Sequence, residues 1–232
     1  MGVAVPGTRR GGGSSAPDTI PPMWAIFDLN GTLVDPSVLV DPGELAVAAL
    51  DEANMMAMVT VIAGRETAFK PLLDAALRRG LARAGLDPAR AEGALGKLPD
   101  MPAYPDVPEA LSALRDGGFR LAVLSQSALD AAETVLTNSG LRGHFELVLS
   151  ASASGALKPE DLAYRYALEQ AGATEAWFVA GHWWDVAGAA YAGLKTAWIS
   201  RTDRVYPTAM PAPDVSGPDL AAVARELLRA AG

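Results

Sequence analysis

The stretch Ala25-Ile-Phe-Asp-Leu-Asn-Gly-Thr-Leu-Val-Asp35 decides the fold class of this 232-residue chain. An apolar run ends at Asp28, and a Gly-Thr turn follows two residues later. A short apolar run bounded by a turn is typical of a strand that is buried on both faces of a parallel sheet. The pattern therefore predicts that the Asp28 carboxyl group lies at the carboxyl end of a strand, where ligands bind in such sheets.

Further short apolar segments alternate with helical patterns along the chain. We predict strands at residues 24–29, 119–125, 146–150, 176–180 and 196–200. We predict helices at residues 107–116, 129–139, 160–171, 186–192 and 219–231. Glycines follow four of these helices at positions where C-terminal caps are expected. The alternation predicts an α/β fold, a doubly wound parallel sheet with helices on both faces.

One interval is too long for a single crossover helix, which divides the chain into parts. Residues 36–102 are mostly helical in pattern and are predicted to form a helical cap inserted over the carboxyl end of the sheet. Residues 23–35 and 103–232 then form the α/β core domain. Residues 1–22, with Arg9-Arg10 before a Gly-rich run, are predicted to be a flexible N-terminal leader.

Composition excludes several classes of function. Half of the residues are hydrophobic, which is enough for a sizeable core. The formal net charge is −8, so binding to nucleic acid or to an anionic membrane surface is not expected. The absence of cysteine excludes disulfides, thiolate metal sites and a cysteine nucleophile. The chain contains no uninterrupted apolar run of about 18 residues, so a membrane span is not predicted. We expect a cytoplasmic protein.

Polar side chains lie in the segments that follow four of the predicted strands. Because the carboxyl ends of parallel strands meet at one edge of the sheet, these side chains are expected to lie close together. They are Asp28, Asn30 and Thr32 in the first group, Ser125 and Gln126 in the second, Lys158 in the third, and His182 and Asp185 in the fourth.

The order and spacing of these four motifs resemble the haloacid dehalogenase superfamily from Trp24 to about Arg201. The motifs are Phe27-Asp-Leu-Asn-Gly-Thr-Leu-Val-Asp35, the serine after Leu121-Ala-Val-Leu124, Lys158-Pro159 and Trp184-Asp185. Within the superfamily, the chain most resembles the capped L-2-haloacid dehalogenase branch. That likeness is carried by Gly64-Arg65 before Phe69, Ala103-Tyr-Pro-Asp106, Tyr164, and Trp184-Asp-Val-Ala-Gly-Ala189.

The resemblance implies a role for each polar residue at the sheet edge. Asp28 would be a nucleophile that forms a covalent ester. Lys158 would offset negative charge, with Asp185 holding it in place. The hydroxyl groups of Thr32 and Ser125 would orient the nucleophile or bind substrate. The structural alternatives are a turn-capping Asp28, a surface Lys158 before a helix, and Thr32 and Ser125 as common turn residues.

Three positions depart from the branch that the chain resembles, and one of them is Asn30, where the resemblance implies a tyrosine. His182 stands where the branch has an asparagine near the hydrolytic water, and a neutral imidazole could position or deprotonate that water. The alternative is a loop histidine that is hydrogen-bonded to backbone. The branch also has an arginine early in the cap, and no cation stands there in this chain. The candidates for substrate binding are Asn30, Gln126, Arg65, Tyr164 and Trp183.

Asn30 distinguishes between two reactions. In phosphate-ester hydrolases of this type, the residue two positions after the nucleophile is an acid that protonates the leaving alkoxide. Asn30 cannot donate an acidic proton, whereas a halide ion leaves without one. An acid that helps to bind Mg²⁺ is also missing, because Gly181 stands four residues before Asp185. We therefore predict hydrolysis of a small anionic substrate, a 2-haloacid, through an aspartyl ester without a metal or other cofactor.

Two alternatives stay open at this stage. The first is a Mg²⁺-dependent phosphatase of the same superfamily, in which Asp28, Asp185, a backbone carbonyl and waters hold the ion. The second is a relative that keeps the fold and only binds a ligand, which the altered Asn30 and Gly181 positions suggest. The resemblance also implies a homodimer.

Overall fold

The computed structural model describes residues 1–2, 23–65 and 67–231, so nearly all of the predicted leader lies outside the described residues. Within them, six parallel strands form one sheet in the order β3-β2-β1-β4-β5-β6. The strands are β1 (Trp24–Phe27), β2 (Arg120–Ser125), β3 (Leu147–Ser150), β4 (Ala176–Ala180), β5 (Lys195–Ile199) and β6 (Val215–Gly217). This order reverses on either side of β1, which confirms the predicted doubly wound fold.

The central position of β1 places the nucleophile candidate. Phe27 pairs with Val123 of β2 and with Val179 of β4, and the Asp28 backbone N–H donates to the Val179 carbonyl (3.0 Å). All three strands therefore end at nearly the same level. The side chains that follow them are brought to one edge of the sheet.

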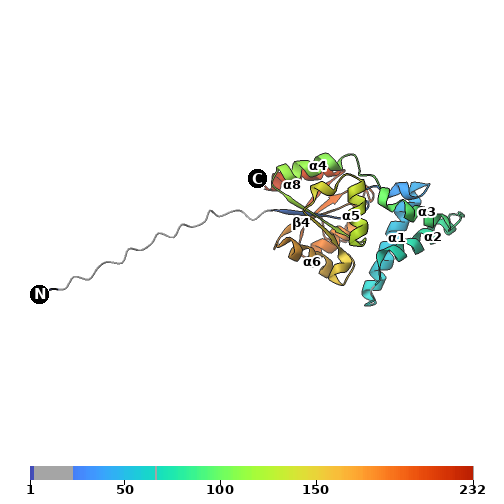
Figure 1. The fold of residues 1–232 in the computed structure, drawn as a ribbon, viewed down its shortest axis with the longest axis horizontal. Helices are drawn as coiled ribbons and strands as arrows, with labels where there is room; N and C mark the ends of the chain where they lie inside the picture. Colours follow the sequence, from blue (N-terminus) through green and yellow to red (C-terminus); the bar gives the residue numbers. More distant parts are fainter. Residues whose placement is uncertain (3–22, 66, 232) are drawn as a thin grey trace.

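Alternate residues of β1 belong to two apolar layers, as the pleat of a strand requires. Ala25 and Phe27 pack with α4 (Val107–Asp116), α5 (Leu129–Asn138) and α8 (Leu220–Ala231). Trp24 and Ile26 pack with α6 (Asp161–Ala171) and α7 (Trp183–Tyr191). Figure 1 shows α4 and α8 on one face of the sheet and α6 on the other.

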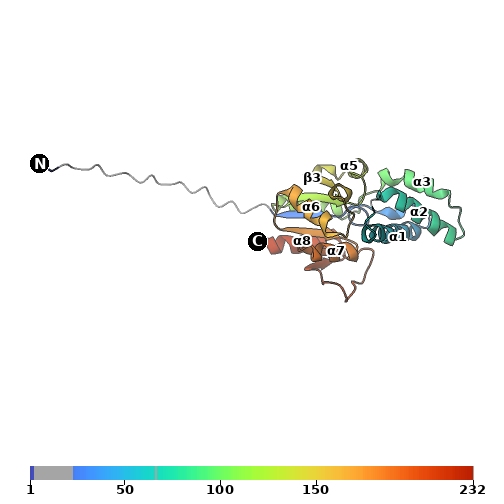
Figure 2. The same cartoon turned by 90° about the horizontal axis from the view of Figure 1, so that it is seen from below.

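The chain between β1 and α4 is a helical insert that stands beside the sheet (Figures 1 and 2). We call residues 36–102 the helical insert. Its elements are η1 (Pro36–Leu39), α1 (Gly43–Ile62), α2 (Phe69–Arg83), α3 (Arg90–Gly96) and η2 (Leu98–Asp100). The two connections to the sheet run side by side, because Val34 forms an antiparallel bridge with Ala103. Asp35 N–H also donates to the Pro102 carbonyl (2.9 Å).

Helix α1 is long and apolar enough, by length and composition, to cross a membrane. Asp51 and Glu52 interrupt its apolar sequence, so α1 contains no continuous apolar run of that length. A single helix of this kind is weak evidence for a membrane span. In this fold α1 packs against α2 and buries Leu50 and Asn54.

Strand β6 is not among the strands that the sequence predicts. β6 has only three residues, all at least partly exposed, and lies at the edge of the sheet. A short edge strand of this kind lacks the apolar run that identifies a buried strand.

Candidate active site

The turn after β1 directs Thr32 back onto Asp28. The N–H groups of Leu33 and Val34 both donate to the Leu29 carbonyl, which closes the turn (2.9 and 3.2 Å). Thr32 Oγ1 donates to Asp28 Oδ2 (2.7 Å) and accepts from the Gly181 N–H (2.9 Å). The hydroxyl group therefore joins the loop after β1 to the loop after β4.

Gly31 is required in this turn for two reasons. Its φ of 78° lies in the left-handed region, which side chains disfavour. A Cβ atom there would also lie 2.7 Å from Cε1 of His182. The absent side chain lets the imidazole ring pack directly against the backbone beside Asp28.

Lys158 is fully buried between two carboxyl groups. Its ammonium group donates to Asp28 Oδ1 (2.8 Å) and to Asp185 Oδ2 (2.5 Å). Gln126 holds the backbone of the lysine in place, because its amide accepts from Lys158 N–H and donates to the Lys158 carbonyl (2.9 Å each). The interpretation of Lys158 as a surface residue is wrong.

Asp185 is also fully buried and has a second partner. Tyr164 donates its hydroxyl to Asp185 Oδ1 (2.6 Å), while the other carboxyl oxygen accepts from Lys158. Both oxygens are therefore paired, which a buried carboxylate requires. Tyr164 was predicted to bind substrate, but it lies behind Asp185 and positions that residue instead.

The charges of this cluster favour an ionised nucleophile. Burial raises the pKa of Asp28, but the charge of Lys158 and the contact with His182 hold that pKa well below its usual value. Burial lowers the pKa of Lys158, and the two carboxylates raise it above its ordinary value overall. Burial and the charge of Asp28 raise the pKa of Asp185 in spite of Lys158. Asp28 is therefore the carboxyl group that most readily loses its proton.

Asp28 faces a small cavity of about 10 Å³ at the junction of the sheet and the helical insert. The core contributes Asp28, Asn30, Gln126, His182 and Trp184 to its wall, and the insert contributes Leu50, Asn54 and Phe69. The cavity has space for about one water molecule. The carboxyl group of residue 28 is therefore not enclosed by solid packing.

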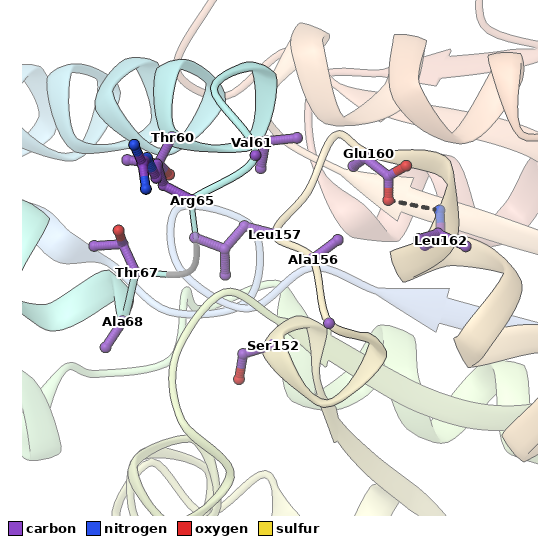
Figure 3. A pocket seen from close by; sticks show the side chains of 12 residues that line it. Thr60, Val61, Arg65, Thr67, Ala68, Ser152, Ala156, Leu157, Glu160 and Leu162 are labelled. Atoms are coloured by element: carbon purple, nitrogen blue, oxygen red, sulfur yellow. Dashed lines mark hydrogen bonds between the residues drawn. The ribbon is translucent and has the colours of Figure 1, made fainter.

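A larger cavity of about 730 Å³ lies elsewhere, between the end of α1 and residues 152–162 (Figure 3). Arg65 and Glu160 are part of its wall, and Glu160 Oε2 accepts from the Leu162 N–H (3.1 Å). Asp28, Lys158 and Asp185 do not line it. We assign the chemistry to the small cavity, because it contains the ionised carboxylate. Arg65, predicted to bind substrate, is exposed and lies outside that cavity.

Two other predicted residues do not line the small cavity. Ser125 is buried, and its Oγ accepts from the Ser127 N–H (3.1 Å). Trp183 donates its backbone N–H to Asp203 Oδ2 (2.9 Å), while the next residue, Trp184, lines the cavity in its place. Successive side chains of a helix point about 100° apart, so only one of the two indoles can face Asp28.

Sequence reasoning missed the contribution of the helical insert to this site. Leu50 and Asn54 are one turn apart on α1, and Phe69 begins α2. Asn54 is a buried polar residue within a stripe of buried apolar residues. A polar residue at the buried spacing of an apolar helix was the signal that could have identified it.

The residues of the site do not fit Mg²⁺. The carboxyl groups that could bind the ion, Asp28 and Asp185, both accept hydrogen bonds from the ammonium group of Lys158. Gly181 adds no side-chain oxygen. Among residues 23–65 and 67–231, no three acidic, histidine or cysteine side chains form a group that could hold a metal ion.

Comparisons with known proteins agree with this arrangement. A family model described as haloacid dehalogenase-like hydrolase matches residues 23–193. The haloacetate dehalogenase H-2 of Moraxella sp. (strain B) is 31% identical, over 85% of this chain and 94% of its own length. The (S)-2-haloacid dehalogenase of Pseudomonas sp. (strain YL) is 30% identical, over 89% and 94%. The crystal structure of the L-2-haloacid dehalogenase RSc1362 is similar, with a TM-score of 0.78, 28% identity, and coverage of 90% and 98%.

Proposed function

Because the chain belongs to the haloacid dehalogenase-like hydrolases, we propose that it hydrolyses the carbon–halogen bond of a small 2-haloacid through an ester on Asp28. The observation that carries this proposal is the ionised Asp28 carboxylate, which Lys158 holds beside a small buried cavity, with Asn30 in place of an acid. Relatives whose names describe haloacetate and 2-haloacid dehalogenases support the choice of substrate.

The first step needs a nucleophile and no acid. A carboxylate oxygen of Asp28 attacks the carbon that bears the halogen, the carbon–halogen bond breaks, and the halide leaves with the bonding electrons. Lys158 stays beside the carboxyl group and balances the charge of Asp185 when Asp28 becomes a neutral ester. Asn30 can then line the cavity without taking part in proton transfer.

The second step regenerates the enzyme. Water attacks the ester carbonyl carbon of Asp28, and the substrate leaves as a 2-hydroxyacid. The oxygen of water stays on Asp28, while the oxygen that attacked the substrate leaves with the product. We propose that the helical insert acts as the cap that keeps bulk water away from this ester.

Labelling of Asp28 tests the proposal. With enzyme in excess over chloroacetate in ¹⁸O water, a single turnover should place ¹⁸O in the peptide that contains Asp28. Asp28→Asn should remove halide release, whereas Asp116→Asn, which changes an exposed residue on α4, should not. Halide release without label in the Asp28 peptide would rule out the ester.

The phosphatase alternative makes an opposite prediction. It requires hydrolysis of phosphate esters that depends on Mg²⁺ and is abolished by a chelator. We expect no such activity, because Lys158, Thr32 and Tyr164 already donate hydrogen bonds to the carboxylate oxygens that the ion would need. Dehalogenation at the same rate with and without chelator would support the metal-independent reaction.

A further inference from the structure

Unpaired polar atoms are concentrated around the cavity in front of Asp28. Among the described residues, seven buried side-chain atoms have no hydrogen-bond partner, and four of them belong to residues that line this cavity. The four atoms are Asn30 Oδ1, Asn54 Oδ1, His182 Nδ1 and Trp184 Nε1. Their side chains are at most 8% exposed. Buried polar atoms are rarely left unpaired, so this clustering requires an explanation.

The size of the cavity and its polar wall both fit a single water molecule. A buried water typically forms about three hydrogen bonds with groups that otherwise lack partners. A water molecule has two hydrogens, so it can donate to two of the three acceptors, Asn30 Oδ1, Asn54 Oδ1 and a neutral His182 Nδ1, and it can accept from the Trp184 indole N–H. A cavity of about 10 Å³ that contains these groups is a built water site.

His182 also lies close enough to act on Asp28. Its Nδ1 is 3.5 Å from Asp28 Oδ2, and its ring packs against Gly31 on one side and lies 5.6 Å from the Trp184 ring. These contacts hold the imidazole beside the carbon atom that water must attack. No such group is needed for the first step, since halide leaves without a proton.

We propose that His182 Nδ1 and Asn54 Oδ1 accept the two hydrogens of the water that hydrolyses the Asp28 ester, and that His182 Nδ1 takes a proton from this water. The inference depends on the proposed function and names the base of its second step. Asn54 belongs to α1, so the helical insert must be closed over the sheet for hydrolysis to proceed.

The charges near His182 set its pKa, and this pKa should change when Asp28 becomes an ester. Burial lowers the pKa of His182, while Asp28, Asp51 and Asp185 raise it, and the net direction is upward. Lys158 is the cation that binds Asp28 and Asp185. Formation of the ester removes the charge of Asp28, the nearest of the three carboxylates. The pKa of His182 then falls, which favours the neutral imidazole.

The proton and the bonds balance over the second step. His182 takes one proton as the water oxygen bonds to Asp28 Cγ. The bond between Cγ and the substrate oxygen then breaks, and that oxygen takes the proton back, which releases the 2-hydroxyacid. Asp28 keeps the water oxygen and loses its acidic proton. The overall reaction therefore releases one proton for each halide ion, and this proton comes from Asp28.

Separate measurement of the two steps tests the inference. With bromoacetate, His182→Gln should still release one bromide per site, because Lys158 keeps Asp28 ionised, and should then accumulate protein that carries one carboxymethyl group on Asp28. Steady-state turnover should fall about 10²- to 10⁴-fold, the usual contribution of a general base. Asn54→Leu should also keep the bromide burst, with hydrolysis slowed about tenfold by the loss of one hydrogen bond to water.

His144→Gln is the matched control, because His144 is the second histidine of the chain and does not line the cavity. His144→Gln should leave the rates of both steps unchanged. Asp28→Asn, which lacks the nucleophile, measures how much bromoacetate reacts with other side chains of the protein without catalysis. Turnover of His182→Gln without accumulated ester would overturn the inference. So would the absence of a bromide burst in folded His182→Gln protein. Failure of the unaltered protein to release halide would instead overturn the proposed function.

Discussion

A fully buried lysine joins the two carboxyl groups of the active site. Taking three ionisable groups out of water is costly, and only direct pairing offsets that cost. Each oxygen of Asp185 and each oxygen of Asp28 has a partner, through Lys158, Tyr164 and Thr32. The site is therefore complete before any substrate enters, and each member depends on the others.

Removal of the lysine charge should affect activity and stability together. Lys158→Met keeps the volume of the side chain but leaves two carboxylates without their shared cation. We expect the free energy of unfolding to fall by about 3 to 5 kcal/mol, the cost of breaking a buried pair. Halide release should become undetectable, because Asp28 then has a raised pKa. Urea denaturation and a halide electrode measure the two effects.

Lys195→Met serves as the control, since Lys195 is exposed on β5. It should change neither quantity by more than the small amount typical of a surface substitution. Equal effects of the two substitutions would contradict the pairing that the structure shows.

At the scale of elements, Asp106 joins three segments on the core side of the molecule. Arg201, after β5, donates to both Asp106 oxygens (2.9 Å each), and the Leu220 N–H at the start of α8 donates to Oδ2 (2.7 Å). Asp106 itself precedes α4. One carboxylate therefore connects β5, α4 and α8, although the three elements are far apart in sequence.

The stability contributed by Asp106 should depend on pH. Burial raises its pKa, but Arg201 and the Leu220 N–H lower it below the ordinary value overall. A lowered pKa stabilises the fold above the pKa of the unfolded carboxyl group, and this stabilisation disappears as the pH falls through the pKa of the folded state. At pH 7, Asp106→Asn should lower the free energy of unfolding by about 2 to 3 kcal/mol.

As the pH falls below the ordinary pKa of an aspartate and through the lowered pKa of folded Asp106, the difference between Asp106→Asn and the unaltered protein should shrink, because the carboxyl group becomes neutral like the asparagine. Urea denaturation at several pH values measures it. A difference that stays constant from pH 7 to pH 3 would show that the pair with Arg201 does not stabilise the fold through charge.

At the scale of the whole molecule, the helical insert sets the size of the substrate space. Leu50 and Phe69 meet Trp184 across the cavity, although the three residues belong to different helices. The cavity of about 10 Å³ leaves space for about one water molecule. These three side chains therefore limit the length of the acid that the proposed reaction can accept.

A shorter side chain at position 50 should broaden the range of substrates. Leu50→Ala should raise the kcat/KM for 2-bromobutyrate, relative to that for bromoacetate, by about tenfold or more, the usual effect of a methylene group in an apolar pocket. Met55→Ala, on the exposed side of the same helix, should leave the ratio unchanged. Parallel kinetics with the two acids measures the ratio, and an unaltered ratio in Leu50→Ala would place the limit on substrate size elsewhere.

The sequence by itself determined the parallel sheet and the residues at its carboxyl edge. Apolar strands have a local signature, and polar residues at strand ends must meet when the strands are parallel and in register. Asp28, Thr32, Lys158 and Asp185 are consequently joined by hydrogen bonds in the structure. The resemblance to haloacid dehalogenases, which depends on these residues, is confirmed by the family match.

Only the tertiary structure decided which residues of the insert and of α7 face Asp28. The direction of a helical side chain depends on how the helix packs, and one residue of shift turns it by about 100°. This is why Trp184 rather than Trp183 lines the cavity, and why Asn54 rather than Arg65 reaches it. Spacing along a chain predicts contacts within an element or along a sheet edge. The docking of one helical layer on another depends on packing that no short stretch of sequence contains.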